Sequence, residues 1–269
     1  MNLGICPMAS SSSGNCFLVR SNRTYILLDA GISSAAVKKN LEMMDVQFWE
    51  MNGVVLTHEH IDHVRSVSAY CHRSTRQHFF ATEGTFAALE EKGKGIPKER
   101  VEIISPGSAF SIGDIEVTSF SLSHDAREPV GYSFHRNGKK ISVVTDTGKV
   151  TGAIEEAIRD SDILIIEANH EENILLYGRY PYNIKHRILS EKGHLSNVAA
   201  GECIGRFLRN MTSLKIPYVM LAHLSQENNT PQQAMLTVSN VLEEEGFYVG
   251  RHLKLSVVQP KEMGDLVTI

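Results

Sequence analysis

The stretch LTHEHIDH, residues 56 to 63, places three histidines, a glutamate and an aspartate within eight residues. It overlaps an apolar run, GVVLTH at residues 53 to 58, that is typical of a short buried strand. Imidazoles and carboxylates are the side chains that commonly bind zinc and related divalent metals. Core histidines do not usually cluster beside carboxylates in this way, so the stretch predicts a metal site at the end of a strand.

The spacing within this cluster indicates two metals. In extended backbone, residues two apart point the same way, so His58 and His60 can bind one ion together. Asp62 and His63 come after the expected turn into a helix and can face a second ion. Hydrolytic two-metal sites keep their ions about 3.5–4 Å apart.

Four other apolar runs also end in a residue that can bind a metal. YILLD ends at Asp29, SFSLSH at His124, SVVTD at Asp146 and YVMLAH at His223. Sites in sheet proteins often lie at strand ends, where loops converge over a rigid scaffold. Any one of these residues taken alone is more often a structural hydrogen-bonding group, but the cluster strengthens all four assignments. Asp146, with two carboxylate oxygens, can bridge a pair of ions.

Strands and helices alternate along the chain of 269 residues, without an internal repeat or a long linker. Apolar, β-rich runs predict strands at residues 16–20, 25–31, 53–58, 101–105, 115–124, 140–148, 162–168 and 218–223. Helical patterns occupy residues 33–44, 83–92, 151–159, 195–210 and 230–244. We therefore expect one domain over residues 1–269, in which helices cover two sheets or one large sheet.

Composition limits the class of protein. The net charge of −4 lacks the basic excess of a charge-driven DNA-binding module, although a metal-dependent nuclease brings positive charge with its metals. The opening MNLGICPMASSSSG does not read as a signal peptide, and no apolar run reaches the 18 residues of a membrane span. The four cysteines have no CxxC spacing and predict free thiols in a reducing compartment. We therefore expect a cytoplasmic protein without a membrane partner.

The order of these motifs resembles the metallo-β-lactamase superfamily, whose HxHxDH signature THEHIDH matches. The resemblance covers essentially the whole chain and implies an α/β fold, an αββα sandwich of two mixed sheets flanked by helices. It also implies two divalent metal ions, zinc or manganese, as cofactors. The ligand sets that it implies are His58, His60 and His124 for one ion, Asp62, His63 and His223 for the other, and Asp146 between them. Asp29 would then hold the ligand loop in place from behind.

Differences among branches of the superfamily narrow the reaction. Its di-iron oxidoreductases carry glutamate where this chain has His60, and its β-lactamases often alter the position of Asp146. Only residues 147–222 separate Asp146 from His223, which leaves no room for the large insertion of RNase J-like nucleases. The five motifs together resemble those of nucleic-acid phosphodiesterases.

A further pair of motifs indicates the same chemistry. EANHE at residues 167 to 171 follows a buried strand, and GHLSN at residues 193 to 197 opens a helix. They resemble a pair in tRNase Z-like nucleases, which implies that Glu167 orients His194 and that His194 protonates the leaving group. The plainer alternatives are a structural acid for Glu167 and a local hydrogen bond for His194. The implied catalytic residues are Asp62, Asp146, Glu167 and His194.

All motifs taken together, including MASSSSGNCFLV and AHLSQENN, resemble the YycJ/WalJ-type subgroup. That subgroup is associated with exonuclease activity on DNA and with DNA repair. The resemblance implies a phosphodiesterase, a 5′-to-3′ exodeoxyribonuclease with a metal-activated hydroxide. The alternatives are an RNA-processing nuclease, a small-molecule hydrolase for esters, thioesters or lactones, and a non-catalytic scaffold. A scaffold need not bury so many titratable groups, which argues against the last.

Three other segments bear on substrate binding. Residues 173 to 193 hold four cations, three tyrosines and a single acid. Tyrosines that stack on bases beside cations that follow phosphates suit single-stranded nucleic acid, and a solvated loop with packed tyrosines is the alternative. Residues 65 to 78, RSVSAYCHRSTRQH, predict a basic surface helix. The turn at residues 10–15 either offers N–H groups to a phosphate or is simply flexible.

Overall fold

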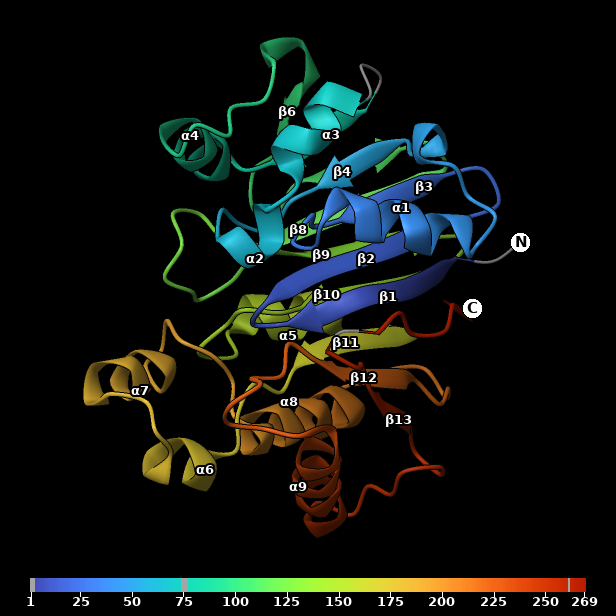
Figure 1. Ribbon diagram of the computed structural model, residues 1–269. Coiled ribbons are helices and arrows are strands. Elements are labelled where there is room, and N and C mark those ends of the chain that lie inside the picture. The colour runs from blue at the N-terminus through green and yellow to red at the C-terminus, as the bar shows by residue number, and fades with distance from the viewer. Residues whose placement is uncertain (1–2, 74–76, 261) are drawn as a thin grey trace.

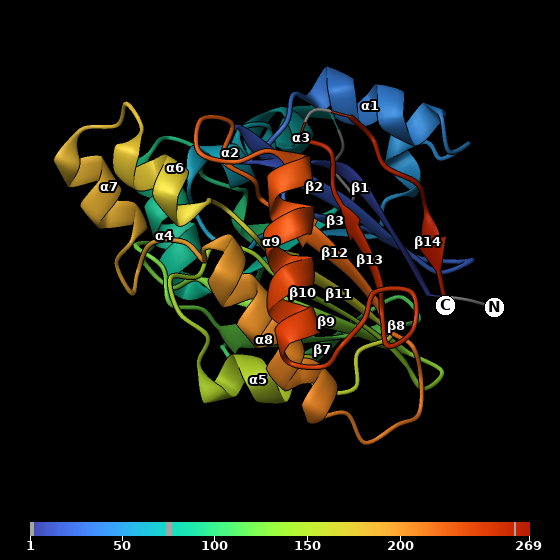
Figure 2. The same ribbon diagram turned by 90° about the horizontal axis from the view of Figure 1, so that it is seen from below.

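The computed structural model of the chain describes residues 3–73, 77–260 and 262–269, which form two mixed β-sheets packed face to face (Figure 1). Helices cover the outer face of each sheet. In Figure 2, helix α1 (Ser34–Glu42) lies outside the first sheet, while α5 (Gly152–Ile158) and α8 (Asn197–Arg209) lie beyond the second. The predicted α/β class and its αββα layering are therefore confirmed.

Each sheet has seven strands among the described residues. The first has the order β14-β1-β2-β3-β4-β5-β6, and the second β13-β12-β11-β10-β9-β8-β7. The strands of the first sheet are β1 (Gly4–Ser11), β2 (Gly14–Arg20), β3 (Tyr25–Leu28), β4 (Gly53–Val55), β5 (His78–Ala81), β6 (Val101–Ile103) and β14 (Val267–Thr268). Those of the second are β7 (Ala109–Ile112), β8 (Ile115–Ser121), β9 (Val130–Arg136), β10 (Lys139–Val144), β11 (Ile163–Glu167), β12 (Tyr218–Ala222) and β13 (Lys254–Val257).

The remaining helices connect these strands. They are α2 (Ile61–Val64), α3 (Val67–Arg73), α4 (Glu83–Glu91), α6 (Glu172–Tyr177), α7 (Tyr182–Ile188) and α9 (Pro231–Glu244), with short 3-10 turns at Phe48–Glu50 and Lys98–Arg100. The basic surface helix predicted within residues 65–78 corresponds to α3, and residues 74–76 of that segment lie outside the described part. None of the described helices is long and apolar enough to cross a membrane.

Strand β11 shows how the layers share their apolar side chains. Successive side chains of a strand point to opposite faces of the sheet. Ile163 and Ile165 accordingly enter the core between the sheets, whereas Leu164 and Ile166 enter the core beneath α5, α8 and α9. The same alternation turns Glu167, the last residue of β11, toward the space between the sheets. A third cluster packs α1, α3 and α4 onto the first sheet.

The carboxyl ends of the parallel strands meet at one edge of the sandwich. In the first sheet β3 to β6 run parallel, and in the second β10 to β13 do. The chain leaves three of these strands through left-handed backbone, with φ of 60° at Asp29, 63° at Asp146 and 55° at His223. Such backbone ends a strand and is retained where the surrounding structure fixes it, as at functional sites.

Several boundaries and elements differ from the sequence prediction. The predicted strands 25–31 and 140–148 are too long, because the left-handed residues end β3 and β10 earlier. The sequence prediction lacked six strands that the described residues form, namely β1, β5, β7, β9, β13 and β14. Pro7 is tolerated in β1 because the register with β2 shifts beside it, at a bulge. Strand β9 carries an alternating apolar pattern that was missed: Val130, Tyr132 and Phe134 enter the core between the sheets.

Gly31 lets the β1–β2 hairpin approach the loop that carries the HxHxDH cluster. The Gly31 N–H donates to the carbonyl oxygen of Asn15 at 2.9 Å. A Cβ atom at this position would overlap the carbonyl oxygen of Asp62 and lie 2.6 Å from the backbone nitrogen of Asn15. Only glycine fits between the hairpin and the loop without moving backbone.

The substitution Gly31→Ala should therefore destabilise the fold. We expect a cost of about 1–3 kcal/mol in the free energy of unfolding, typical of an overpacked site. Urea titration measures it. Gly152→Ala is the matched control, because a Cβ atom there meets no atom within 4 Å. Equal stability of the two variants would contradict the packing described here.

Candidate metal centre

The seven residues predicted as metal ligands meet at the edge where the strands end. The residues of the HxHxDH cluster follow β4, and the others follow β8, β10 and β12. Four groups of three or more side chains place their ligand atoms within 4.8 Å of one another. These groups include His58, His60, Asp62, His63, His124, Asp146 and His223, together with Glu167 and His194. The structure thus brings together every predicted site residue.

The two predicted ligand sets lie side by side. In one set, the Nε2 atom of His124 is 3.3 Å from Nδ1 of His60. In the other, the Oδ2 atom of Asp62 is 3.4 Å from Nε2 of His63 and 3.5 Å from Nε2 of His223. His60 has the most accessible imidazole of these four histidines, with 26% of its side chain exposed. The centre is therefore open to solvent on the side of His60.

Asp146 lies between the two sets. Its Oδ2 atom is 3.1 Å from Nε2 of His63. Its Oδ1 atom is 3.4 Å from Nε2 of His223 and 3.8 Å from Nε2 of His124. A carboxylate in this place can contact a cation in either set, which is the geometry that a bridging ligand requires.

The donor set fits divalent cations. Within the described part of the chain, Nε2 of His58, Nε2 of His223 and Oδ2 of Asp146 are buried without a hydrogen bond, and the last two contact other side chains of the centre at 3.1 to 3.5 Å. Buried polar atoms are nearly always paired, so these atoms need another partner. Burial, reinforced by the neighbouring His63, holds the pKa of His58 well below its usual value, so its ring is neutral and can donate a lone pair. A neutral imidazole and ionised carboxylates are the forms that bind metal.

Asp29 supports this centre from behind. Its Oδ2 atom is 2.7 Å from Nδ1 of His63, and its Oδ1 atom accepts from the Thr57 N–H at 2.8 Å. The side chain is buried, with 1% exposed. A carboxylate on the far nitrogen fixes the tautomer and orientation of an imidazole ligand. Asp29 therefore fixes both the ring of His63 and the backbone that precedes His58.

Two other imidazoles are oriented in the same way. The Nδ1 atom of His124 donates to the carbonyl oxygen of Gly193 at 3.0 Å. The Nδ1 atom of His223 is 2.8 Å from Oε1 of Glu167. Because the Nδ1 atoms are occupied, both rings present Nε2 to the centre.

Glu167 also contacts His194. Its Oε1 atom is 2.7 Å from Nδ1 of His194, and its Oε2 atom accepts from the N–H groups of Thr147 and Leu195. Burial alone would raise the pKa of Glu167, but its contacts with His194 and His223 outweigh burial and hold the pKa at about 2. The ring of His194 stacks on that of His223 with centroids 5.3 Å apart. Nδ1 of His194 is occupied, so Nε2 is the nitrogen available for proton exchange.

The pKa of His223 reflects the carboxylates around its ring. Burial opposes a charged ring, but the carboxylates of Asp146, Asp62 and Glu167 outweigh it and raise the pKa of His223 to about 10. Positive charge is therefore favoured at this position, and a divalent cation would supply it.

The serine-rich turn at residues 10–15 contacts the centre through its two buried ends, while Ser12 and Ser13 at its tip are exposed. The Nδ2 atom of Asn15 is 3.0 Å from Nε2 of His63 and 3.4 Å from Oδ2 of Asp62. The Oγ atom of Ser10 accepts from the N–H of His223 at 3.0 Å. Both side chains are fully buried. The two ends of the turn are therefore fixed against the centre, and the role of Asn15 could not be predicted because only the fold brings it to the ligands.

Asp125 is a second residue that the sequence prediction missed. Its Oδ1 atom is 3.4 Å from Nε2 of His124 and 3.9 Å from Nε2 of His60. Its carboxylate also accepts two hydrogen bonds from the guanidinium of Arg187. Its position directly after His124 was the available sequence signal. Arg187 belongs to the segment predicted to bind single strands.

That segment forms helices α6 and α7, an arm at the edge of the molecule (Figure 1). Tyr177 and Tyr182 are 88% and 82% exposed, so the alternative of packed tyrosines is wrong for these two. Lys185 donates to the carbonyl oxygen of Leu176 and thereby joins the two helices. The arm thus presents aromatic rings to solvent beside the candidate metal centre.

Comparison with known proteins identifies relatives over nearly the full length. Residues 24–249 match the family model described as the beta-lactamase superfamily domain. The chain is 36% identical to exodeoxyribonuclease YycJ of Bacillus anthracis, covering 97% of each chain. It is 34% identical to exodeoxyribonuclease WalJ of Streptococcus pneumoniae, covering 97% of this chain and 96% of the relative. The metallo-beta-lactamase fold protein YhfI from Bacillus subtilis has a TM-score of 0.74 at 14% identity, with both chains fully covered.

The pKa of Glu167 predicts how the stability of the metal-free protein depends on pH. The folded value of about 2 lies below the ordinary 4.5, so the carboxylate stabilises the fold above about pH 4.5. That contribution, on the order of 3 kcal/mol, is lost as the pH falls toward about 2. Glu167→Gln removes this titration. Its free energy of unfolding should therefore be lower near neutral pH and fall less steeply with acidification.

Urea unfolding of the metal-free proteins across the acid range measures this slope. Glu191→Gln is the control, because Glu191 is exposed and pairs with Lys149 at the surface. The control should keep the wild-type slope. A wild-type slope in Glu167→Gln would show that Glu167 does not titrate as described.

Proposed function

Since the chain belongs to the metallo-β-lactamase superfamily, we propose that it is a metal-dependent phosphodiesterase that degrades DNA from an end, a 5′-to-3′ exodeoxyribonuclease. The matched exodeoxyribonucleases support the substrate class, because they align with this chain over almost their whole length. The residues at the centre support a hydrolytic reaction with zinc or manganese, since imidazoles suit zinc and the two central carboxylates are compatible with manganese.

The observation that carries this proposal is the pairing of Glu167 with His194 beside the ligand sets. Cleavage of a phosphodiester releases a sugar hydroxyl, a poor leaving group that benefits from protonation. His194 has Nδ1 fixed by Glu167 and stacks on His223, so its Nε2 is positioned at the edge of the centre. A small ester cleaved by activated water has less need of such an acid.

The residues of the centre then have distinct roles. Bound divalent metals would activate the attacking water and stabilise the charge of the phosphate. His58, His60 and His124 would hold one ion, Asp62, His63 and His223 would hold the other, and Asp146 lies between the two sets. The carboxylates of Asp62 and Asp146 would also help to orient the attacking water. Ionised Glu167 keeps a proton on Nδ1 of His194, and Nε2 of that ring delivers a proton to the departing oxygen.

Other features support a single-stranded DNA end as the substrate; a role in DNA repair is implied only by the resemblance of the sequence motifs. The exposed rings of Tyr177 and Tyr182 are suited to stack on unpaired bases, an interaction that does not depend on the base sequence.

All four cysteines are free thiols, as predicted, which suits the reducing cytoplasm that we propose as the location.

His194→Gln tests the proton donor. We expect kcat on DNA to fall about 10²- to 10⁴-fold, the usual contribution of a general acid, with metal content unchanged. Gln preserves a polar group of similar size, so metal analysis of the purified variant separates chemistry from assembly. Retention of kcat would exclude His194 as the donor.

Asp146→Ala tests the function as a whole. Wild-type protein loaded with Mn²⁺ or Zn²⁺ should trim 5′- or 3′-end-labelled DNA, and the label released first fixes the polarity. The variant should lose metal and at least about 100-fold in activity, since even residues outside the ligand set commonly cost 10–100-fold. Matched RNA and a panel of esters, thioesters and lactones complete the assay. Cleavage of RNA alone, or of a small ester but no nucleic acid, would replace the proposed function with the corresponding alternative.

A further inference from the structure

A hollow of about 410 Å³ opens directly beside the candidate metal centre. His60 and Asp62, two predicted ligands, form part of its lining. Lys92, Lys94 and Arg187 also line it. Lys92 caps α4, Lys94 follows it, and Arg187 belongs to α7. Helices α4, α2 and α7 lie at the same end of the molecule in both Figure 1 and Figure 2.

Glu59 and Asp62 also line this hollow, but the contacts of its two lysines are with backbone carbonyl oxygens. Lys92 donates to the carbonyl oxygen of Glu59, and Lys94 donates to the carbonyl oxygens of Val64 and Arg65. Within the described part of the chain, neither ammonium group forms an ion pair. Burial, together with repulsion from Arg65 and Lys92, lowers the pKa of Lys94, which shows how closely the cations are gathered.

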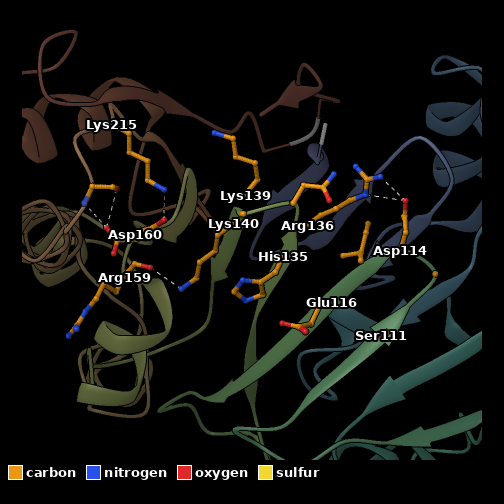
Figure 3. Close-up of a pocket in the computed structure, with 15 residues that line it drawn as sticks. Ser111, Asp114, Glu116, His135, Arg136, Lys139, Lys140, Arg159, Asp160 and Lys215 are labelled. Atoms are coloured by element: carbon orange, nitrogen blue, oxygen red, sulfur yellow. Dashed lines mark hydrogen bonds and ion pairs between the residues drawn. The ribbon is translucent and has the colours of Figure 1, made fainter. Parts of the chain in front are cut away.

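The opposite end of the second sheet provides a contrast. A larger hollow of about 820 Å³ lies at the start of β10, whereas the metal centre lies beyond the end of that strand (Figure 3). Most of its cations are compensated: Lys139 and Lys215 both pair with Asp162, and Arg136 pairs with Asp114, whereas Lys140 donates to the carbonyl oxygen of Arg159. Most of the positive charge that lines this larger hollow therefore already forms ion pairs within the fold.

Lysines that contact only carbonyl oxygens can exchange these hydrogen bonds for hydrogen bonds to a phosphate with little loss of free energy. A hydrogen bond between two charged groups is stronger than one to a neutral carbonyl. The apolar side chain of Ile61, 54% exposed in the same hollow, offers a surface for a sugar or base. Arg187 is held by Asp125 and so keeps its guanidinium at the rim of the centre.

We propose that this hollow binds the phosphate backbone of the substrate strand next to the scissile phosphodiester, through Lys92, Lys94 and Arg187. The inference rests on the proposed function and narrows it, because the substrate must then extend at least one phosphate beyond the reacting one. A polynucleotide strand has that phosphate. A simple diester such as bis(4-nitrophenyl) phosphate does not.

The test compares Lys92→Gln/Lys94→Gln with the control Lys98→Gln/Lys254→Gln. Both variants remove two positive charges, but Lys98 and Lys254 are exposed near the starts of β6 and β13, at the opposite end of these strands from the metal centre. Arg187 is left intact because its partner Asp125 contacts the histidines. Metal content and thermal unfolding verify that each variant is folded and loaded.

We expect the Lys92/Lys94 variant to raise KM for a labelled single strand about tenfold or more. Two lost phosphate contacts should also flatten the dependence of log kcat/KM on log salt by about 1.4. The loss in kcat/KM should be at least about fivefold greater for the strand than for bis(4-nitrophenyl) phosphate. The control variant should match the wild type on both substrates.

Other outcomes separate this inference from the proposed function. Equal losses on strand and simple diester would overturn it and assign the lysines to support of the metal centre. Unchanged KM and salt dependence on DNA would also overturn it, and would show that the strand follows another path. Wild-type protein that cleaves the simple diester but no nucleic acid would refute the proposed function itself.

Discussion

A carboxylate buried between two apolar sheets is stable only when charged or hydrogen-bonding groups surround it. Asp146 is in this position, with 1% of its surface exposed at the end of β10. Imidazoles of His63, His124 and His223 approach its oxygens to within 3.1 to 3.8 Å, and they come from helix α2 and from the loops after β8 and β12. Each of these rings is fixed at Nδ1 by another part of the fold. The arrangement of both sheets at this edge therefore depends on satisfying one buried charge.

Glu167 connects His223, a proposed metal ligand, with His194, the proposed proton donor. One of its oxygens contacts both His223 and His194, so metal binding and proton transfer share a support. The local charge near the centre differs from the net charge of the whole chain, which is −4. Among the described residues, Lys92 and Lys94 donate to backbone carbonyl oxygens and form no ion pair. Local charge, rather than the total, is what an approaching polyanion meets.

Most of the fold was predictable from apolar periodicity, with errors where tertiary contacts override it. The buried run at residues 162–168 gave β11 within one residue at each end, because a strand covered on both faces is apolar throughout. Strand β1 could not be predicted from its proline and serines, since its pairing with β2 and β14 holds it in the sheet. The left-handed backbone at Asp29 and Asp146 likewise shortens two strands in a way that propensity does not encode.

For the site, the sequence by itself determined the donor chemistry: the HxHxDH spacing and the polar residues that end apolar runs specify a cluster of imidazoles and carboxylates. Only the tertiary structure decided which atoms face one another. Asn15 reaches the ligands from β2, which no local pattern connects to them, and Asp125 is marked in the sequence only by following His124. The reason is physical. Whether a side chain can bind a metal depends on that side chain alone, whereas the distances between Asp146 and the three histidines depend on how the two sheets pack.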